Sequence, residues 1–206
     1  MNANEIECVV FDVETTGLSP LSGDRIVEIA AVKMKNGHIT DTFESLVNPE
    51  RDIPIEASRI HNISEDMVAG APSRQEVLPQ VLQFIGGACL VGHNIKFDLD
   101  FFCFELSLIG RRVHDATPAI DTIKMAKRLL PQLSTYRLGN LAQYFGANVQ
   151  ETHRALSDVK LTVMIVTRLL DLAVKQGISS PADIFKEFGV AKPNFKIQEA
   201  SQDVLF

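Results

Sequence analysis

Five ionisable residues fall in three separated clusters and form a candidate metal site. The clusters hold Asp12 and Glu14 in V-V-F-D-V-E-T-T-G, Asp98 in H-N-I-K-F-D-L-D, and His153 with Asp158 in T-H-R-A-L-S-D-V. Each acid lies in an otherwise apolar segment, where a carboxylate is costly unless it is paired or binds a metal. Oxygen ligands of this kind favour Mg²⁺ or Mn²⁺ over zinc. The first hypothesis is therefore a hydrolytic metal site.

Asp12 and Glu14 are expected to project from one face of a strand. Residues two apart on a strand point to the same side, with Cα atoms about 7 Å apart. Two carboxylates at the end of a buried strand can converge on one cation. The alternative is that Glu14 is exposed at the end of the strand and only Asp12 needs a partner. Taken alone, a D-x-E pair is weak evidence for a metal site.

Asp98 and Asp158 are each expected on a largely buried helix. Asp98 lies between Phe97 and Leu99, so it needs a strong partner; the alternatives to a metal are a buried salt bridge or a helix cap. Asp158 lies near a helix N-terminus, where the helix dipole favours the ionised carboxylate. His153 precedes this helix and could act on a water held by the acids, although an ordinary surface or core histidine is the alternative.

Strand and helix patterns alternate along the chain and must position these clusters. Ile6 to Val13 is a β-branched apolar run typical of a buried strand. Strands at Arg25 to Lys35 and His38 to Val47 flank the hairpin dipeptide Asn36-Gly37. The remaining expected elements are a helix at 73–85 containing Pro79, a strand at 88–92, a buried helix at 95–109, a strand at 119–122, and helices near 123–130, 137–145 and 154–175. This order predicts an α/β fold with a mixed sheet covered by helices.

Residues 1–176 are expected to form one domain and residues 177–206 a C-terminal extension. A length of 206 residues favours a single domain with a short appendage. With 46% hydrophobic and 22% charged residues, the chain has the composition of a globular protein with a sizeable core. The extension is expected to hold a short helix from Pro181 to Phe188. A polar, aperiodic and mobile tail is expected from Ala191 onward.

Composition also limits the compartment and the kind of ligand. The first residues lack the basic region of a signal peptide, and no apolar run is long enough to cross a membrane. Cys8, Cys89 and Cys103 are odd in number and widely spaced, which is typical of core residues in a reducing cytoplasm. A net charge of -6 argues against a broad duplex-binding surface, but not against an enzyme that binds one end of a strand.

Three motifs, in order, resemble the exonuclease motifs of the DEDDh (DnaQ-like) 3′→5′ exonucleases. They are F-D-V-E-T-T-G, H-N-I-K-F-D and H-R-A-L-S-D, and the resemblance covers residues 7–175, including I-H-N-I-S at 60–64 and Y-R-L-G-N-L at 136–141. Three motifs in order are far more specific than one. Within the family, the chain most resembles the proofreading exonuclease (epsilon) of bacterial DNA polymerase III, or a stand-alone relative of it. Asn62 stands where the family often has glycine, and asparagine tolerates the left-handed region that glycine would adopt there.

The resemblance implies a ribonuclease H-like fold, a five-stranded mixed sheet with antiparallel first strands and helices on both faces. It also implies two Mg²⁺ or Mn²⁺ ions. Asp12, Glu14 and Asp158 would hold the first ion, Asp12 would bridge to the second, and Asp98 would support the second ion directly or through water. His153 would be the general base on the attacking water. In such two-metal displacement one ion lowers the pKa of the water and the other stabilises the leaving oxygen.

The resemblance implies further residues that contact the substrate, namely Thr15, Gly17, Leu18, His61, Asn94 and Phe102. Thr15 and Gly17 match the loop that holds the terminal nucleotide, although Gly17 is equally explained as a turn glycine with positive φ. Leu18 matches an apolar wedge against the last base, or an exposed loop leucine. Phe102 would stack on a base or fill the core.

The implied activity is removal of nucleoside 5′-monophosphates from the 3′ end of single-stranded DNA, in replication proofreading or repair. An RNA exonuclease of the same family, similar to oligoribonuclease or ribonuclease T, is the first alternative, because the motifs are shared. The second alternative is a non-catalytic binding module of a replication complex. The intact set of acids argues against the second alternative.

The last five residues resemble the bacterial sliding-clamp binding pattern Gln-x-x-Leu-Phe. A mobile segment can insert Leu205 and Phe206 into a pocket of a partner while Gln202 makes polar contacts. A sliding clamp and a DNA polymerase subunit are therefore expected partners, besides the nucleic acid. The alternatives are a chance match or a tail folded back onto the core.

Overall fold

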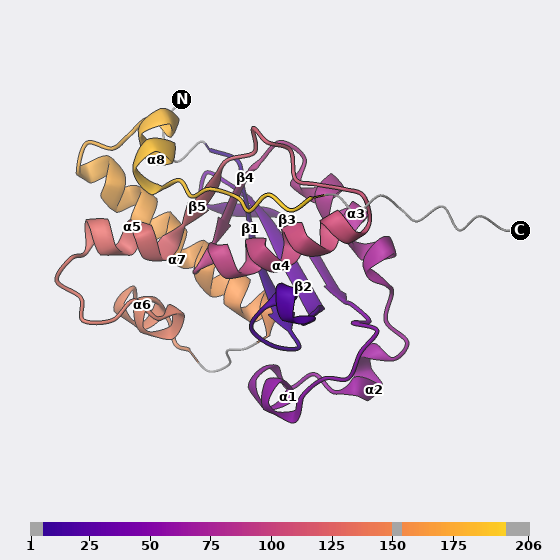
Figure 1. Ribbon diagram of the computed structural model, residues 1–206. Helices are drawn as coiled ribbons and strands as arrows, with labels where there is room; N and C mark the ends of the chain where they lie inside the picture. The colour runs from indigo at the N-terminus through magenta and orange to yellow at the C-terminus, as the bar shows by residue number, and fades with distance from the viewer. Residues whose placement is uncertain (1–5, 150–153, 197–206) are drawn as a thin grey trace, which may run out of the picture.

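The computed structural model describes residues 6–149 and 154–196, which are built around one five-stranded sheet (Figure 1). The strands are β1 (Cys8–Thr15), β2 (Ile26–Lys35), β3 (His38–Leu46), β4 (Cys89–Gly92) and β5 (Ala119–Asp121). Their order across the sheet is β3-β2-β1-β4-β5. β1, β2 and β3 pair in antiparallel fashion, and β4 and β5 run parallel to β1. The predicted mixed sheet is confirmed.

Eight α-helices lie within the described ranges. They are α1 (Ile55–His61), α2 (Glu65–Val68), α3 (Arg74–Ile85), α4 (Ile95–Leu108), α5 (Thr122–Leu129), α6 (Leu138–Tyr144), α7 (Ala155–Lys175) and α8 (Pro181–Phe188), and a 3-10 turn η2 spans Pro20–Ser22. The helices predicted from the sequence agree with these to within a few residues. The short helices α1 and α2 were not predicted, since a helix of one or two turns is too short to show an apolar period. None of the helices described here is both long and apolar enough to cross a bilayer.

The two faces of the sheet bury alternate residues of β1. Cys8 and Val10 belong to the core shared with α7, whereas Val9 and Phe11 belong to the core shared with α3 and α4. Figure 1 shows α7 and α4 on opposite faces of the sheet. Because side chains alternate along a strand, even-numbered residues of β1 face α7. Asp12 and Glu14 therefore continue the row that points toward α7.

α8 packs into the same core as the rest of the chain. Ile184 and Phe188 are fully buried in the core that contains α5 and α7. Directly after α8, Gly189 forms a β-bridge with Ile120, and the Val190 N–H donates to the Ala119 carbonyl at 2.9 Å. The helix expected at Pro181 to Phe188 is present, and the expected domain boundary at residue 176 remains a prediction.

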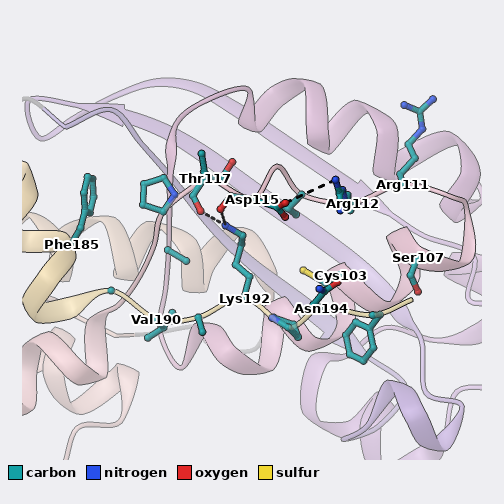
Figure 2. A pocket seen from close by; sticks show the side chains of 18 residues that line it. Cys103, Ser107, Arg111, Arg112, Asp115, Thr117, Phe185, Val190, Lys192 and Asn194 are labelled. Atoms are coloured by element: carbon teal, nitrogen blue, oxygen red, sulfur yellow. Dashed lines mark hydrogen bonds and ion pairs between the residues drawn. The ribbon is translucent and has the colours of Figure 1, made fainter. Parts of the chain in front are cut away.

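Residues 189–196 form a strap that runs from β5 along α4 (Figures 1 and 2). Figure 2 shows Lys192 reaching the carbonyl groups of Asp115, at 3.1 Å, and Thr117. Phe195 packs edge-on against Phe104, with ring centroids 5.3 Å apart. Between the strap and the segment 111–118 lies a hollow of about 530 Å³.

The strap contains residues 191–196 of the tail expected from Ala191 onward, and the mobility of that tail remains a prediction. The sequence of the strap shows no helical or strand period, as in a linker. Two long side chains, Lys192 and Phe195, nevertheless anchor the strap to the domain. The clamp-like residues Gln202, Leu205 and Phe206 lie outside the described residues.

We expect Phe188→Ala to lower the free energy of unfolding by about 3–5 kcal/mol, because it empties a fully buried position where α8 meets the main core. Urea denaturation of the full chain measures this. Lys186→Ala, on the exposed side of the same helix, is the control and should change stability by less than about 0.5 kcal/mol. Equal effects of the two substitutions would show that α8 is peripheral to the core.

Candidate active site

Three carboxylates meet where β1 ends beside the start of α7. One oxygen from each of Asp12, Glu14 and Asp158 lies within 4.8 Å of the other two. β1 supplies two of these groups from one face, in agreement with the alternation expected of a strand. α7 supplies the third from its first turn. Three carboxylates at this spacing form a donor set suited to a hard divalent cation such as Mg²⁺ or Mn²⁺.

Asp98 approaches the same place from the other layer of the fold. It lies on the first turn of α4 and is only 3% exposed. Its Oδ1 accepts a hydrogen bond at 3.1 Å from the N–H of Val13, the residue between Asp12 and Glu14. Asp98 is not one of the three acids whose oxygens gather within 4.8 Å. It is thus bonded to the backbone that presents the cluster, an arrangement that differs from the salt bridge or helix cap considered from the sequence.

The acids of the cluster raise one another's pKa. Burial, then the charge of Asp98 and then that of Glu14, hold the pKa of Asp12 well above its usual range. Burial and the charge of Asp158 raise the pKa of Glu14 to about 8, although Arg154 opposes the shift. Burial also raises the pKa of Asp98, against the hydrogen bond from Val13. A bound cation would reverse this balance by favouring the ionised acids, which is the behaviour expected of metal ligands.

The turn after β1 contains three of the residues implied as substrate contacts. The Thr15 hydroxyl donates to the Gly17 carbonyl at 2.6 Å, and Leu18 is 87% exposed at the tip. Gly17 does not have a positive φ, so the turn-glycine explanation is wrong. A Cβ atom at Gly17 would instead collide with the carboxylate of Asp24, whose Oδ2 accepts the Ser19 N–H at 3.1 Å. Any side chain at Gly17 would therefore force the Asp24 carboxylate to move out of its hydrogen bond with Ser19.

His61 lies at the end of α1 with its side chain only 2% exposed. Its Nδ1 accepts the Ile63 N–H at 3.1 Å, so the neutral ring carries its proton on Nε2. Burial lowers the pKa of His61, while the Thr15 carbonyl opposes the shift, which places the ring beside the β1 turn. Asn62 adopts φ 57°, the left-handed conformation that asparagine was expected to tolerate.

A cleft of about 960 Å³, with both polar and apolar lining, opens beside the acidic cluster. It is lined by Asp12, His93, Asn94, Ile123, Lys127, Ser134, Thr135, Tyr136, Arg137, Leu138, Gly139, Asn140, Val149 and Asp158. Asn94 thus lines the cleft, as implied, at the left-handed residue before α4. The cleft leaves room for a ligand that reaches both Asp12 and Asp158.

Phe102 is not available to a substrate, which corrects its expected role as a base-stacking residue. Its side chain is 0% exposed and packs on Phe11, with ring centroids 5.8 Å apart. Because Phe102 follows Asp98 by one helical turn, it was expected near the site. Its side chain instead lies on the side of α4 that faces the sheet. The alternative of a core residue holds.

His153 lies outside the described residues, and its predicted role as the base stays a prediction. Its neighbour Arg154 is the N-cap of α7 and pairs with Glu28 of β2. Sequence reasoning missed both members of this pair. The rule that drew attention to Asp12, a carboxylate inside an apolar strand, applies equally to Glu28 in R-I-V-E-I-A-A-V. The cleft residues Lys127 of α5 and Arg137, the N-cap of α6, were also missed as site residues, because a solvated cation carries no distinctive pattern.

The chain matches one protein family and several curated proteins over most of its length. The RNase_T family, described as Exonuclease, matches residues 9–166. The chain is 41% identical over 180 residues to "DNA polymerase III PolC-type" of Caldanaerobacter subterraneus subsp. tengcongensis, covering 87% of this chain and 13% of that protein. It is 37% identical over 168 residues to "3′-5′ exonuclease DinG" of Bacillus subtilis, covering 82% and 18%. The chain thus spans less than a fifth of the length of these two curated relatives.

Solved structures of similar fold include nucleases bound to DNA. Exonuclease X in complex with 5′ overhanging duplex DNA matches with a TM-score of 0.68 and 30% identity, over 87% of this chain and 98% of that chain. E. coli Exonuclease I in complex with a dA16 oligonucleotide matches with a TM-score of 0.71 and 16% identity, over 82% and 43%. The second likeness is one of fold alone.

Without divalent ions, we expect the free energy of unfolding to fall as the pH rises. Folded Glu14 has a pKa of about 8, against 4.5 for an ordinary glutamate, so between pH 4.5 and pH 8 the folded chain holds a proton that the unfolded chain releases. This stabilisation is fully present below pH 4.5 and is lost as the pH rises through 8. Thermal unfolding in EDTA across this range measures the loss, and saturating Mn²⁺ should offset it by binding the ionised acids.

Glu14→Gln is the control for this pH dependence. The amide cannot release a proton, so the slope of stability against pH in EDTA should become shallower than in the wild type. An unchanged slope would contradict the assignment of the raised pKa to Glu14.

Proposed function

Because the chain belongs to the exonuclease family, we propose that it is a metal-dependent 3′→5′ exonuclease that hydrolyses DNA to nucleoside 5′-monophosphates. The observation that carries this proposal is the gathering of Asp12, Glu14 and Asp158 within 4.8 Å of one another. Two of these acids also line a cleft large enough for the end of a strand. The reaction adds water across the last phosphodiester bond, so that phosphorus gains the water oxygen and the 3′ oxygen leaves with a proton.

Each acid has a part in this reaction. Asp12, Glu14 and Asp158 would hold Mg²⁺ or Mn²⁺, and Asp98 would support a second ion beside Asp12. When bound, such ions activate water and stabilise the charge on the phosphoryl oxygens. His153 would accept the proton of the attacking water as general base. The hydrogen bond from Val13 orients Asp98 before any ligand binds.

DNA is the proposed substrate for reasons of relationship and charge. Exonuclease X, 30% identical to this chain, was solved with DNA, and the curated relatives are named as DNA polymerases and a 3′→5′ exonuclease. Lys127 and Arg137 place positive charge along the cleft of a chain whose net charge is -6. Local cations of this kind suit one bound strand end better than a long duplex. We expect the enzyme to act with the replication machinery, in the cytoplasm.

We expect Asp12→Ala or Asp158→Ala to remove nearly all release of mononucleotides from 3′-labelled single-stranded DNA, because each deletes a cation ligand. His153→Ala should lower kcat by about several hundredfold if it is the base. The assay compares Mg²⁺ with EDTA, and circular dichroism checks that each variant is folded. Asp100→Ala is the matched control, since Asp100 lies on the same helix as Asp98 but pairs with Lys96 at the surface.

Full turnover by Asp12→Ala would refute the catalytic assignment. The same assay on DNA and RNA strands of matched sequence shows which polymer is the better substrate. A higher kcat/KM on RNA would replace the proposed substrate by that of an RNA exonuclease of the same family.

We also propose that the C-terminal residues Gln202, Leu205 and Phe206 bind a bacterial sliding clamp. The motif Gln-x-x-Leu-Phe and the relationship to DNA polymerase III support this partner. The strap supports it as well, because Lys192 and Phe195 anchor the chain shortly before the motif begins. Such an attachment would hold the nuclease beside a polymerase at the primer end.

We expect Leu205→Ala combined with Phe206→Ala to abolish binding to the purified clamp, because these side chains would supply the buried contact area. Calorimetry measures the affinity, and turnover on a short single strand should stay at the wild-type level. Asp203→Ala combined with Val204→Ala changes the two variable positions of the motif and is the control. Wild-type clamp affinity in the Leu205 and Phe206 variant would exclude this attachment.

A further inference from the structure

Glu28 places a fourth carboxylate next to the acidic cluster. It stands directly opposite Glu14 in the antiparallel pairing of β1 and β2, and its side chain is 1% exposed. Directly opposed side chains of antiparallel strands lie on the same face, where like charges destabilise the pair. A carboxylate this buried must therefore be compensated by partners from another element.

Those partners come from the start of α7. Arg154 donates from Nε to both oxygens of Glu28 at 3.2 Å, and from Nη2 to Oε1 at 2.5 Å. A guanidinium that contacts both oxygens of a carboxylate fixes orientation as well as distance. The two residues are 126 positions apart in the chain. The pair thus joins β2 to α7 at one defined point.

Glu28 also caps α7. Its Oε2 accepts the N–H of Ala155, the first residue of the helix, at 2.9 Å. The N-cap residue Arg154 does not cap the helix with its own side chain, which is directed to Glu28. A carboxylate at a helix N-terminus satisfies an otherwise unpaired donor and interacts favourably with the helix dipole. The cap is therefore supplied by a strand of the sheet.

The position of Asp158 depends on this same turn of helix. Its N–H donates to the Arg154 carbonyl at 3.1 Å, so Asp158 lies one helical turn from the residue that Glu28 holds. In the sequence, the proposed base His153 immediately precedes Arg154. The acids of the cluster repel one another, so the close approach of α7 to β1 needs an attraction from elsewhere. The bonds between Glu28 and the first turn of α7 supply part of it, beside the apolar packing of α7 on the sheet.

We propose that Glu28 and Arg154 are positioning residues of the active site, an inference that rests on the proposed exonuclease function. They hold the first turn of α7 against β2 and so set the distance of the Asp158 carboxylate from Asp12 and Glu14. They act through Asp158 and need no contact with the cation or the nucleic acid.

A second buried pair provides a matched control. Glu105 of α4, 1% exposed, accepts the Ile26 N–H at 2.7 Å, and its Oε2 lies 4.0 Å from Nε of Arg74. This pair also links an acid, an arginine and a backbone donor of another element. It joins α3 and α4 to the first residue of β2, and Arg74 also pairs with Glu50 at 2.7 Å. None of these contacts is with α7 or with the acidic cluster.

The test compares Arg154→Met, Arg154→Lys, Glu28→Gln and Arg74→Met in the full chain. Mn²⁺ affinity is measured by electron paramagnetic resonance without nucleic acid, and kcat and KM are measured on single-stranded DNA. We expect Arg154→Met to lower Mn²⁺ affinity and kcat by about 10–100-fold, as for residues that orient metal ligands, with KM for DNA little changed. Arg154→Lys should recover part of both losses. Arg74→Met should lower the unfolding temperature but keep the wild-type Mn²⁺ affinity.

Wild-type Mn²⁺ affinity and kcat in folded Arg154→Met would overturn the proposal, and so would an equal loss of Mn²⁺ affinity in Arg74→Met. If Arg154→Met does not fold, Glu28→Gln, which keeps the volume of the side chain, decides through the same Mn²⁺ titration. If the wild type releases no nucleotide from any strand, the exonuclease assignment fails, whereas the Mn²⁺ titration still tests the positioning role.

Discussion

The mutual repulsion of carboxylates that are partly withdrawn from solvent is the constraint on which the arrangement of this site depends. Asp12, Glu14 and Asp158 come within 4.8 Å of one another, and burial already disfavours the charged forms of Asp12 and Glu14. The charges of such a cluster oppose its assembly in the absence of a cation. The surrounding fold must therefore supply the attraction, and the cost of keeping the acids together is met by packing and hydrogen bonds in other parts of the domain.

Hydrogen bonds on both faces of the sheet contribute to this attraction. On one face, α4 sends Asp98 to the backbone N–H of Val13, which fixes the end of β1. On the other face, Glu28 and Arg154 tie the start of α7 to β2. β1 lies between these two attachments, so its carboxylates stand on a strand that is held from both layers. The fold itself thus positions these side chains from two sides, as a site that must be arranged before its ligand binds would need.

Much of this arrangement follows from local patterns in the sequence. The alternation of β1 predicts the shared face of Asp12 and Glu14, and the apolar runs predict the sheet and most of its helices. Phe102 shows where such reasoning ends, because spacing along a helix does not tell which side faces the core. The reason for glycine at position 17, the close approach of Asp24, can be seen only in the folded turn. Glu28 could have been found by the same rule as Asp12, but its partner lies 126 residues away.

The raised pKa of Glu14 has a consequence for how the enzyme would respond to acid. Protons and divalent cations compete for the same oxygens, so each cation that enters the cluster near neutral pH displaces protons into solution. The apparent affinity for the cation must then rise with pH. The acidic limb of a rate profile will follow this exchange at the cluster, and it will move to lower pH as the concentration of the cation is increased.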